Sequence, residues 1–417
     1  MWKCGICKLG YIHIQLGNSL IPKKTVFMAI QRNISNHVLS MAKEYPSLTI
    51  MGPRQSGKTT LAKMLFPDHQ YINLEEPDNR EFAQKYPRDF LKNYSGDLII
   101  DEVQRVPDLL SYIQAITDDK NKKGQFILTG SHQPQIKANI TQSLAGRTAV
   151  ITLLPLSIGE LNSAGFVFER DEYIFKGFMP RIYSENANPK HLYQNYYATY
   201  VERDVRQLIN VGHQISFERF IKLLAGRIGQ IVNLNSLAGD VGVSQTTLTS
   251  WLSVLEASFI VFRLHCYFNN FGKRLIKAPK LYFTEVGLAA NLLGIESPQQ
   301  VFRDPLCGGL FENMVIIEAL KTMYNQGKNH GHGPGLYYLR NQNGLEIDLI
   351  LSKGRDITPI EIKSGASFDA SFAKNIKLFR KLSDSINGGY VVYGGDKRIA
   401  IEDTEFVNFR EVASILA

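Results

Sequence analysis

The chain has 417 residues, of which 44% are hydrophobic and 21% charged, a composition typical of a globular protein with roughly two to four domains. The net charge of +8 permits contact with nucleic acid, but a whole-chain average does not establish it. Four cysteines are too few for a disulfide framework, and no apolar run of about 18 residues predicts a membrane span. We therefore expect a cytoplasmic protein with no membrane partner.

The first 27 residues lack the apolar segment and cleavage site of a secretory signal. Met28 looks like a more natural start of the globular part. We expect residues 1–27 to be an extension with little structure.

Residues 28–156 alternate short apolar runs with helical stretches, which predicts a parallel α/β sheet. A helical lid is expected over residues 157–210. The predicted strands are Leu48–Met51, Gln70–Asn73, Leu98–Asp101, Gln125–Thr129 and Ala149–Leu153.

The segment GPRQSGKTT, residues 52–60, contains the phosphate-binding signature G-x-x-x-x-G-K-[ST] between an apolar strand and a helical stretch. Gly52 and Gly57 allow the backbone N–H groups to turn toward a phosphate chain. Lys58 would reach the β- and γ-phosphates, and Thr59 would bind Mg²⁺. A chance glycine-rich turn is the alternative. The residues expected to bind ATP are Gly52, Pro53, Arg54, Gln55, Ser56, Gly57, Lys58, Thr59 and Thr60.

Hydrolysis needs a carboxylate that holds the metal and a group that orients water. The run DLIIDE places Asp101 at the end of a buried strand to hold Mg²⁺, and Glu102 beside it to polarise the attacking water. A solvated turn is the alternative for an acidic pair after a strand. A position roughly forty residues after the phosphate loop favours the catalytic interpretation.

Further polar residues are candidates for the same site. Thr129 and Ser131 follow another strand and could contact the γ-phosphate or the attacking water. Arg147 could serve as an arginine finger in a neighbouring subunit, which would imply a homo-oligomer, or form a salt bridge at a helix end. Arg181 is a second candidate charge sensor.

Residues 211–293 resemble a winged helix-turn-helix. Leu237, Ala238 and Val241 would line the first helix, Gly242 would turn the chain, and Ser244 would cap the second helix. The second helix would bury Leu248, Trp251, Leu252 and Leu255, and it would expose Gln245, Thr246, Thr249 and Ser250. A basic wing of Lys273, Arg274, Lys277 and Lys280 would contact DNA phosphates. An interdomain packing module is the alternative.

Residues 301–417 hold a second candidate site. Asp348 lies on one predicted strand, Glu361 and Lys363 share a face of the next, and a helix can bring Glu312 to them. These carboxylates could hold a second Mg²⁺ or Mn²⁺ ion for phosphodiester hydrolysis, with Lys363 orienting the water. A surface ion pair is the alternative for Glu361 and Lys363.

This last pattern resembles the PD-(D/E)xK restriction-endonuclease-like superfamily, whose residues correspond here to Glu312, Asp348, Glu361 and Lys363. The chain from Met28 onward resembles a prokaryotic family of AAA-type ATP-binding proteins with a C-terminal domain of unknown function. That resemblance depends on GPRQSGKTT, LIIDE, ILTGS, LAGR, LPLS, YVERDV, the helix-turn-helix, KLYFTEVGL and EIDLIL…IEIKS. It implies ATP binding, and nuclease activity by analogy of fold. Family members often have Asp at the position of Glu285, where no hydrolytic role is expected.

The leading hypothesis is an ATP-hydrolysing AAA-type protein that acts on DNA, with its nucleotide state coupled to the winged-helix and nuclease-like domains. One alternative is a nucleotide-dependent regulatory protein whose C-terminal domain binds without cutting. Another is a metal-dependent nuclease for which ATP only licenses assembly.

Overall fold

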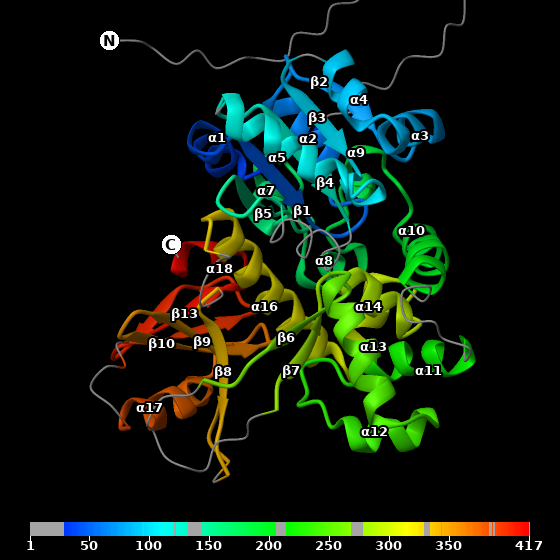
Figure 1. Ribbon diagram of the computed structural model, residues 1–417. Coiled ribbons are helices and arrows are strands. Elements are labelled where there is room, and N and C mark those ends of the chain that lie inside the picture. The colour runs from blue at the N-terminus through cyan, green and yellow to red at the C-terminus, as the bar shows by residue number, and fades with distance from the viewer. Residues whose placement is uncertain are drawn as a thin grey trace, which may run out of the picture.

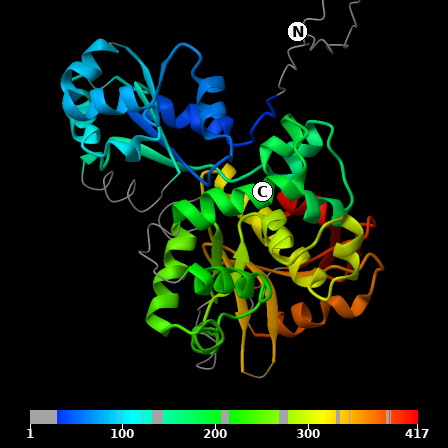
Figure 2. The ribbon, with the colours of Figure 1, turned by 90° about the vertical axis from the view of Figure 1, so that its right-hand side faces the viewer.

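The computed structural model describes residues 29–94, 96–120, 122–131, 143–205, 214–267, 278–328, 334–342, 344–382, 386 and 388–416. An N-terminal lobe, blue to cyan in Figure 1, lies above a larger body that runs from green to red. Figure 2 shows the same two parts after a quarter turn. The predicted extension, residues 1–27, lies outside the described residues.

The N-terminal lobe is built on a parallel sheet, which has five strands within the described residues, in the order β2-β3-β4-β1-β5. The strands are β1 (Ser47–Met51), β2 (Gln70–Asn73), β3 (Leu98–Asp101), β4 (Phe126–Gly130) and β5 (Thr148–Thr152). Each predicted strand is confirmed to within one residue at either end. Helix α1 (Ser35–Glu44) precedes β1, and the helices between the later strands are, in chain order, α2 (Lys58–Leu65), α3 (Pro77–Lys85), α4 (Pro87–Asn93), η1 (Val103–Arg105) and α5 (Leu109–Lys120).

Helices cover both faces of this sheet. Side chains such as Ile50 and Ile127 pack with Leu61 of α2, whereas Ile100 packs with Phe90 of α4 on the other face. A strand that is buried on both faces has a continuous apolar sequence, which made β1, β3 and β4 predictable; β2 is exposed at its first two residues.

A helical segment connects the two parts. It comprises α7 (Ile158–Ser163), α8 (Arg170–Lys176), α9 (Pro180–Ser184), α10 (Pro189–Tyr196) and a π-helical stretch η2 (Tyr197–Val205). Ser157 and Glu160 form a capping box that fixes the start of α7.

The middle of the chain contains a pair of helices joined by a tight turn. The elements are α11 (Gln214–Ala225), α12 (Leu234–Val241), α13 (Gln245–Ala257), β6 (Val261–Leu264), β7 (Lys280–Phe283), α14 (Val286–Leu292) and α15 (Pro298–Arg303). Gly242 has a φ of +79°, and Ser244 caps α13 by accepting a hydrogen bond from the N–H of Thr247 at 3.1 Å. The predicted turn, cap and buried face of α13 are confirmed.

The basic wing is not confirmed. Lys273, Arg274 and Lys277 lie outside the described residues. The prediction for Lys280 is wrong, because its side chain is 3% exposed and cannot contact DNA phosphates. Lys280 begins a strand whose four residues are all buried.

The C-terminal part has a mixed sheet with the order β12-β13-β11-β10-β9-β8 among the described strands. Its elements are α16 (Cys307–Asn325), β8 (Leu336–Arg340), β9 (Glu346–Lys353), β10 (Asp356–Lys363), η3 (Ala370–Ala373), α17 (Lys374–Arg380), β11 (Tyr390–Tyr393), β12 (Ile399–Ile401), β13 (Thr404–Asn408), η4 (Phe409–Glu411) and α18 (Val412–Ile415). Helix α16 reaches from this sheet toward the N-terminal lobe (Figure 1). In the described part of the chain, no helix combines the length and apolar character needed to cross a bilayer.

Candidate functional site

The phosphate-binding loop lies between the end of β1 and the start of α2. Gly52 has a φ of +156°, and a β-carbon there would lie 2.0 Å from the carbonyl oxygen of Leu153. Gly57, with a φ of +92°, immediately precedes α2. Both glycines are therefore required by the backbone, one by close approach and the other by conformation.

Lys58 is buried and lies across this loop. Its ammonium group donates to the carbonyl oxygens of Gly52 at 3.1 Å and Pro53 at 2.8 Å. Burial lowers the pKa of Lys58 to about 8, although the nearby Glu102 and Asp101 carboxylates oppose the change. The buried hydroxyl of Ser56 has no hydrogen-bond partner among the residues that the structure describes. A polyanion would give both groups acceptors.

Thr59 and Asp101 come together although they lie 42 positions apart. The Thr59 hydroxyl donates to Asp101 Oδ2 at 2.9 Å. The same carboxylate accepts hydrogen bonds from Tyr71 at 2.9 Å and from Thr129. Since β4 lies between β1 and β3, Thr129 is placed beside the end of β3. Hydroxyl and carboxylate oxygens are ligands that Mg²⁺ prefers, so Thr59 and Asp101 fit this metal.

Glu102 is held in an unusual backbone conformation. Its φ of +56° is in the left-handed region, which non-glycine residues adopt rarely and often at functional sites. The Glu102 carboxylate accepts hydrogen bonds from Ser131 at 3.2 Å and from the amide of Gln104. Ser131 thus contacts the predicted water-activating group, and Thr129 contacts the predicted metal ligand.

The three candidate arginines from the sequence analysis each pair with an acidic side chain. Arg54, within the loop, pairs with Glu75 at 2.8 Å. Arg181 pairs with Glu185 at 2.9 Å on the surface of α9. Arg147 precedes β5 and donates to Asp118 at 3.1 Å. It lies at the N-terminal ends of β1 and β5, whereas the phosphate loop follows the C-terminal end of β1.

A buried arginine that the sequence analysis missed supports the loop from behind. Arg32 donates to the carbonyl oxygens of Ser56 at 2.8 Å and Leu154 at 2.6 Å, and it pairs with Glu160 at 3.1 Å. Glu160 also accepts from the backbone N–H of Ser157 at 2.8 Å. The ion pair between Arg32 and Glu160 thereby connects the phosphate loop to the start of the helical segment.

A cavity of about 330 Å³ opens next to Gly57 and Thr60. Its walls are mostly apolar, as is typical of sites for small ligands. The other lining residues are Ala29, Ile30, Arg32, Leu61, Met64, Leu156, Pro180, Ser184 and Glu185.

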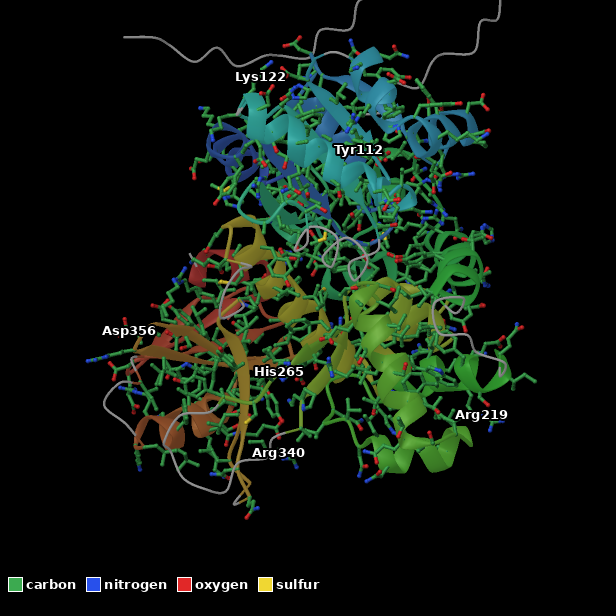
Figure 3. The ribbon with its side chains drawn as sticks, in the orientation of Figure 1. Tyr112, Lys122, Arg219, His265, Arg340 and Asp356 are labelled. Atoms are coloured by element: carbon green, nitrogen blue, oxygen red, sulfur yellow. The ribbon has the colours of Figure 1, made fainter. Side chains whose placement is uncertain are left out.

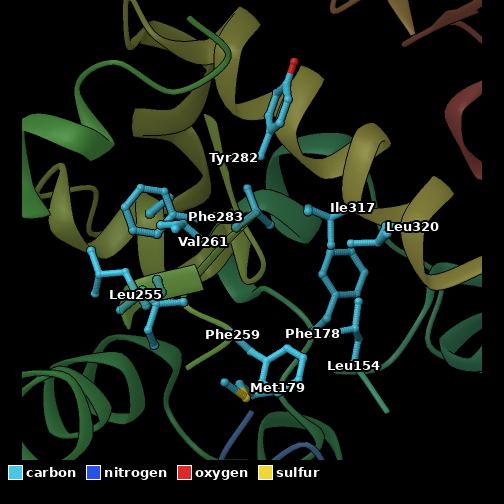
Figure 4. Close-up of a cluster of buried hydrophobic side chains, with 14 of the residues drawn as sticks. Leu154, Phe178, Met179, Leu255, Phe259, Val261, Tyr282, Phe283, Ile317 and Leu320 are labelled. Atoms are coloured by element: carbon cyan, nitrogen blue, oxygen red, sulfur yellow. The ribbon is translucent and has the colours of Figure 1, made fainter. Parts of the chain in front are cut away.

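Helix α16 contacts the turn that follows β5. Glu318 accepts a hydrogen bond from the N–H of Ile158 at 2.8 Å, and Lys321 donates to the carbonyl oxygen of Leu156 at 2.7 Å. Burial raises the pKa of Glu318 and lowers that of Lys321. Figure 4 shows Ile317 and Leu320 of α16 beside Phe178 and Leu154.

Glu285 is almost fully buried and organises the turn before α9. One of its carboxylate oxygens accepts from the N–H of Phe178 at 2.9 Å and from the Tyr193 hydroxyl at 3.0 Å. Burial raises the pKa of Glu285. These contacts fit a structural role for Glu285.

The C-terminal acidic residues converge, but a lysine lies among them. The ammonium group of Lys280 is 3.0 Å from Glu312, 2.7 Å from Glu346 and 4.0 Å from Asp348. Although burial opposes its charge, these three carboxylates raise the pKa of Lys280. The Tyr282 hydroxyl also donates to Glu312, at 2.6 Å.

The other half of this cluster is centred on Lys363. Its ammonium group contacts Asp348 at 3.1 Å and also pairs with Glu361. Burial and the neighbouring Asp348 raise the pKa of Glu361 to about 8. One oxygen of Glu361 lacks a hydrogen-bond partner in the described part of the chain.

The metal site predicted from these residues is not confirmed. Within the described ranges, no three His, Cys, Asp or Glu side chains are placed to hold a metal ion together. Asp348, Glu361 and Glu312 are instead paired with lysines. The sequence analysis assigned Lys280 to a basic wing, and it missed Glu346, although Glu346 lies two residues before Asp348 and thus on the same face of β9.

Three family profiles match successive parts of the chain. Residues 44–162 match the AAA domain, residues 168–299 match a domain of unknown function (DUF8612), and residues 307–412 match a second one (DUF4143). The chain therefore contains an AAA domain followed by two segments that match domains of unknown function.

Similar proteins occur in mycobacteria. An uncharacterized protein of Mycobacterium tuberculosis is 29% identical over 364 residues, which cover 86% of this chain and 79% of that protein. The same values apply to an uncharacterized protein of Mycobacterium bovis. Among solved structures, a Walker-type ATPase of Pyrococcus abyssi matches with a TM-score of 0.39 and 13% identity, over 66% of this chain and 99% of that one.

Proposed function

We propose that the protein binds ATP with Mg²⁺ and hydrolyses it at the phosphate loop. The observation that carries this proposal is the 2.9 Å contact between Thr59 and Asp101, which joins the two expected metal ligands from separate segments. Asp101 and Glu102 then occupy adjacent positions with different partners, as distinct roles in metal binding and water activation require.

Each residue of the loop has a role in this proposal. Backbone N–H groups from Gly52 to Thr60, including those of Gln55 and Gly57, bind the phosphates together with the N-terminal end of α2. Lys58 exchanges its loop carbonyls for phosphate oxygens. Bound Mg²⁺ would neutralise charge on the phosphates, and Thr59 and Asp101 would hold it. Glu102 orients and deprotonates the attacking water, while Thr129 and Ser131 hold the two carboxylates in place.

The cavity beside Gly57 and Thr60 is the proposed place for the nucleoside. It adjoins the phosphate loop, and its volume falls in the range typical of small-ligand sites. Pro180 and Ser184 bring α9 into its wall, so a nucleoside bound there would contact both the N-terminal lobe and the helical segment.

Lys58 gives the direct test of this proposal. Replacing Lys58 with alanine is expected to weaken ATP binding by about tenfold or more and to abolish turnover, because charged hydrogen bonds to phosphate are each worth about 1.5–3 kcal/mol. Fluorescent-nucleotide titration and phosphate release measure the two effects. Lys85, an exposed lysine of α3 that pairs with Glu81, provides a control, and Lys85→Ala should retain both activities. A Lys58→Ala variant with wild-type turnover would remove the phosphate-loop assignment.

We further propose that nucleotide state is coupled to the C-terminal domain. Arg32 and Glu160 connect the phosphate loop to the turn after β5, and Glu318 and Lys321 connect that turn to α16. Every link is a buried hydrogen bond or ion pair. Movement of the loop on nucleotide binding would therefore reach α16 through contacts that are costly to break.

A homo-oligomer is part of the proposal. Arg147 lies a five-residue strand away from the phosphate loop of its own chain, roughly 17 Å by the rise per strand residue. It could therefore serve as an arginine finger for a neighbouring copy after release from Asp118. Arg181 adjoins the cavity wall and remains a proposed charge sensor in its own chain.

DNA is the proposed macromolecular partner. The exposed side chains of α13, among them Gln245, Thr246, Thr249 and Ser250, are polar and lie on the helix that would enter a groove of a winged helix-turn-helix. Because Lys280 is buried, phosphate contacts must come from other basic residues.

A metal-dependent nuclease is the second reading of the C-terminal domain, favoured by the convergence of Asp348, Glu361 and Lys363. Plasmid DNA incubated with Mg²⁺ or Mn²⁺, with and without ATP, separates the readings. Because lysines already pair with the carboxylates, we expect no nicking by the wild type or by Lys363→Ala. Nicking that requires Lys363 would instead support a cutting domain with a restriction-endonuclease-like mechanism.

A further inference from the structure

A lysine from outside the C-terminal sheet lies at the centre of its acidic cluster. Lys280 begins β7, whereas Glu312 lies on α16 and both Glu346 and Asp348 lie on β9. The Lys280 ammonium group contacts Glu312 and Glu346 at 3.0 and 2.7 Å, with Asp348 at 4.0 Å. With 3% of its side chain exposed, this lysine cannot turn away into solvent.

The contacts of this ammonium group are those that a cation would need. A divalent ion among carboxylates takes their oxygens at about 2.0–2.6 Å, and Lys280 already uses Glu312 Oε1 and Glu346 Oε1. An ion could not approach these oxygens without displacing the lysine or meeting its positive charge. The lysine balances part of the negative charge of the carboxylates, but it offers no open coordination position.

The surrounding groups complete this arrangement. Tyr282, two residues after Lys280, donates to the same oxygen of Glu312 at 2.6 Å. Arg340, at the end of β8 and labelled in Figure 3, lies 3.5 Å from the second oxygen of Glu346. Glu312 and Glu346 are therefore both held by protein donors.

We propose that Lys280 is the resident cation of this site. Its ammonium group takes the position among Glu312, Glu346 and Asp348 that a divalent metal would require, so the native domain binds no metal there. The site then joins β7, α16 and β9 through charge, and the C-terminal domain acts by binding rather than by metal-assisted hydrolysis. This inference concerns the C-terminal domain and does not depend on ATP turnover.

Mn²⁺ titration of the nucleotide-free full chain, followed by electron paramagnetic resonance of the free ion, tests the proposal. In the wild type, Asp348→Asn is expected to leave Mn²⁺ binding unchanged. Lys280→Met is expected to gain one Mn²⁺ site, because removing the lysine charge leaves the carboxylates free to bind the ion. Its affinity should exceed that of any wild-type binding that depends on Asp348 by about tenfold or more. The double variant Lys280→Met/Asp348→Asn should lose that site. Lys280→Arg keeps a cation and should gain none.

Two results would overturn the proposal. One is wild-type Mn²⁺ binding that falls about tenfold on Asp348→Asn, which would mean that metal and lysine coexist. The other is a folded Lys280→Met variant that gains no site. If Lys280→Met does not fold, Lys280→Gln takes its place, because its amide can still donate to the carboxylates. The wild-type comparison remains decisive in either case.

Discussion

Replacing Glu102 with glutamine is expected to lower ATP turnover by about 10²- to 10⁴-fold, the contribution typical of a general base. Glutamine keeps the size of the side chain but cannot accept a proton from water. Because the hydrogen bonds that the structure gives Lys58 and Thr59 go to Gly52, Pro53 and Asp101 and not to Glu102, ATP affinity should stay within a few-fold of the wild type. Phosphate release under single-turnover conditions, with nucleotide titration in parallel, measures the two quantities.

Neighbouring residues provide the controls for this variant. Ser131→Ala removes the hydroxyl that donates to Glu102 at 3.2 Å, and a smaller loss of turnover is expected because the carboxylate remains. Glu76, which lies outside the site at the start of α3, should tolerate glutamine. Turnover of Glu102→Gln at the wild-type rate would assign water activation to another group.

Removing the buried Arg32 is expected to destabilise the protein by about 3–5 kcal/mol, the usual cost of breaking one partner of a buried ion pair. In Arg32→Ala the carboxylate of Glu160 would stay buried without its cation, and three backbone carbonyl oxygens would lose their donor. Chemical denaturation of the full chain measures the loss. ATP affinity should also fall, because the carbonyl of Ser56 belongs to the phosphate loop.

Two further variants separate charge from packing. Adding Glu160→Gln to Arg32→Ala removes the uncompensated charge and should restore part of the stability. Arg398, which pairs with Glu405 and Glu411 on the surface, is the matched exposed arginine, and its replacement should have little effect. If Arg32→Ala is as stable as Arg398→Ala, the ion pair with Glu160 is not a structural support.

Local signals predicted much of the ATPase domain. The strands were visible as apolar runs because helices cover both faces of the sheet, and the phosphate loop has a fixed spacing of glycine, lysine and threonine. The proximity of Thr59 and Asp101 followed from the motif order. The helix pair α12 and α13 was predictable from Gly242, Ser244 and the period of the apolar residues.

Long-range pairs of charges were not predictable in the same way. Arg32 and Glu160 lie 128 positions apart, and neither has a distinctive neighbourhood in sequence. Lys280 was assigned to a basic wing because basic residues precede it. The apolar run Leu281, Tyr282 and Phe283 was a signal that could have placed Lys280 at the start of a buried strand.

The contacts of α16 have a thermodynamic consequence for ligands at both of its ends. From Glu312 to Lys321 the helix rises roughly 14 Å, at about 1.5 Å per residue, so one continuous helix joins the two sets of contacts. If ATP binding at the other end changes the affinity for a partner bound near Glu312, linkage requires that the partner change the affinity for ATP by the same factor. A partner of the C-terminal domain would then act as an effector of the ATPase. The direction of its effect could be measured as a change in ATP affinity or as a change in the affinity for the partner.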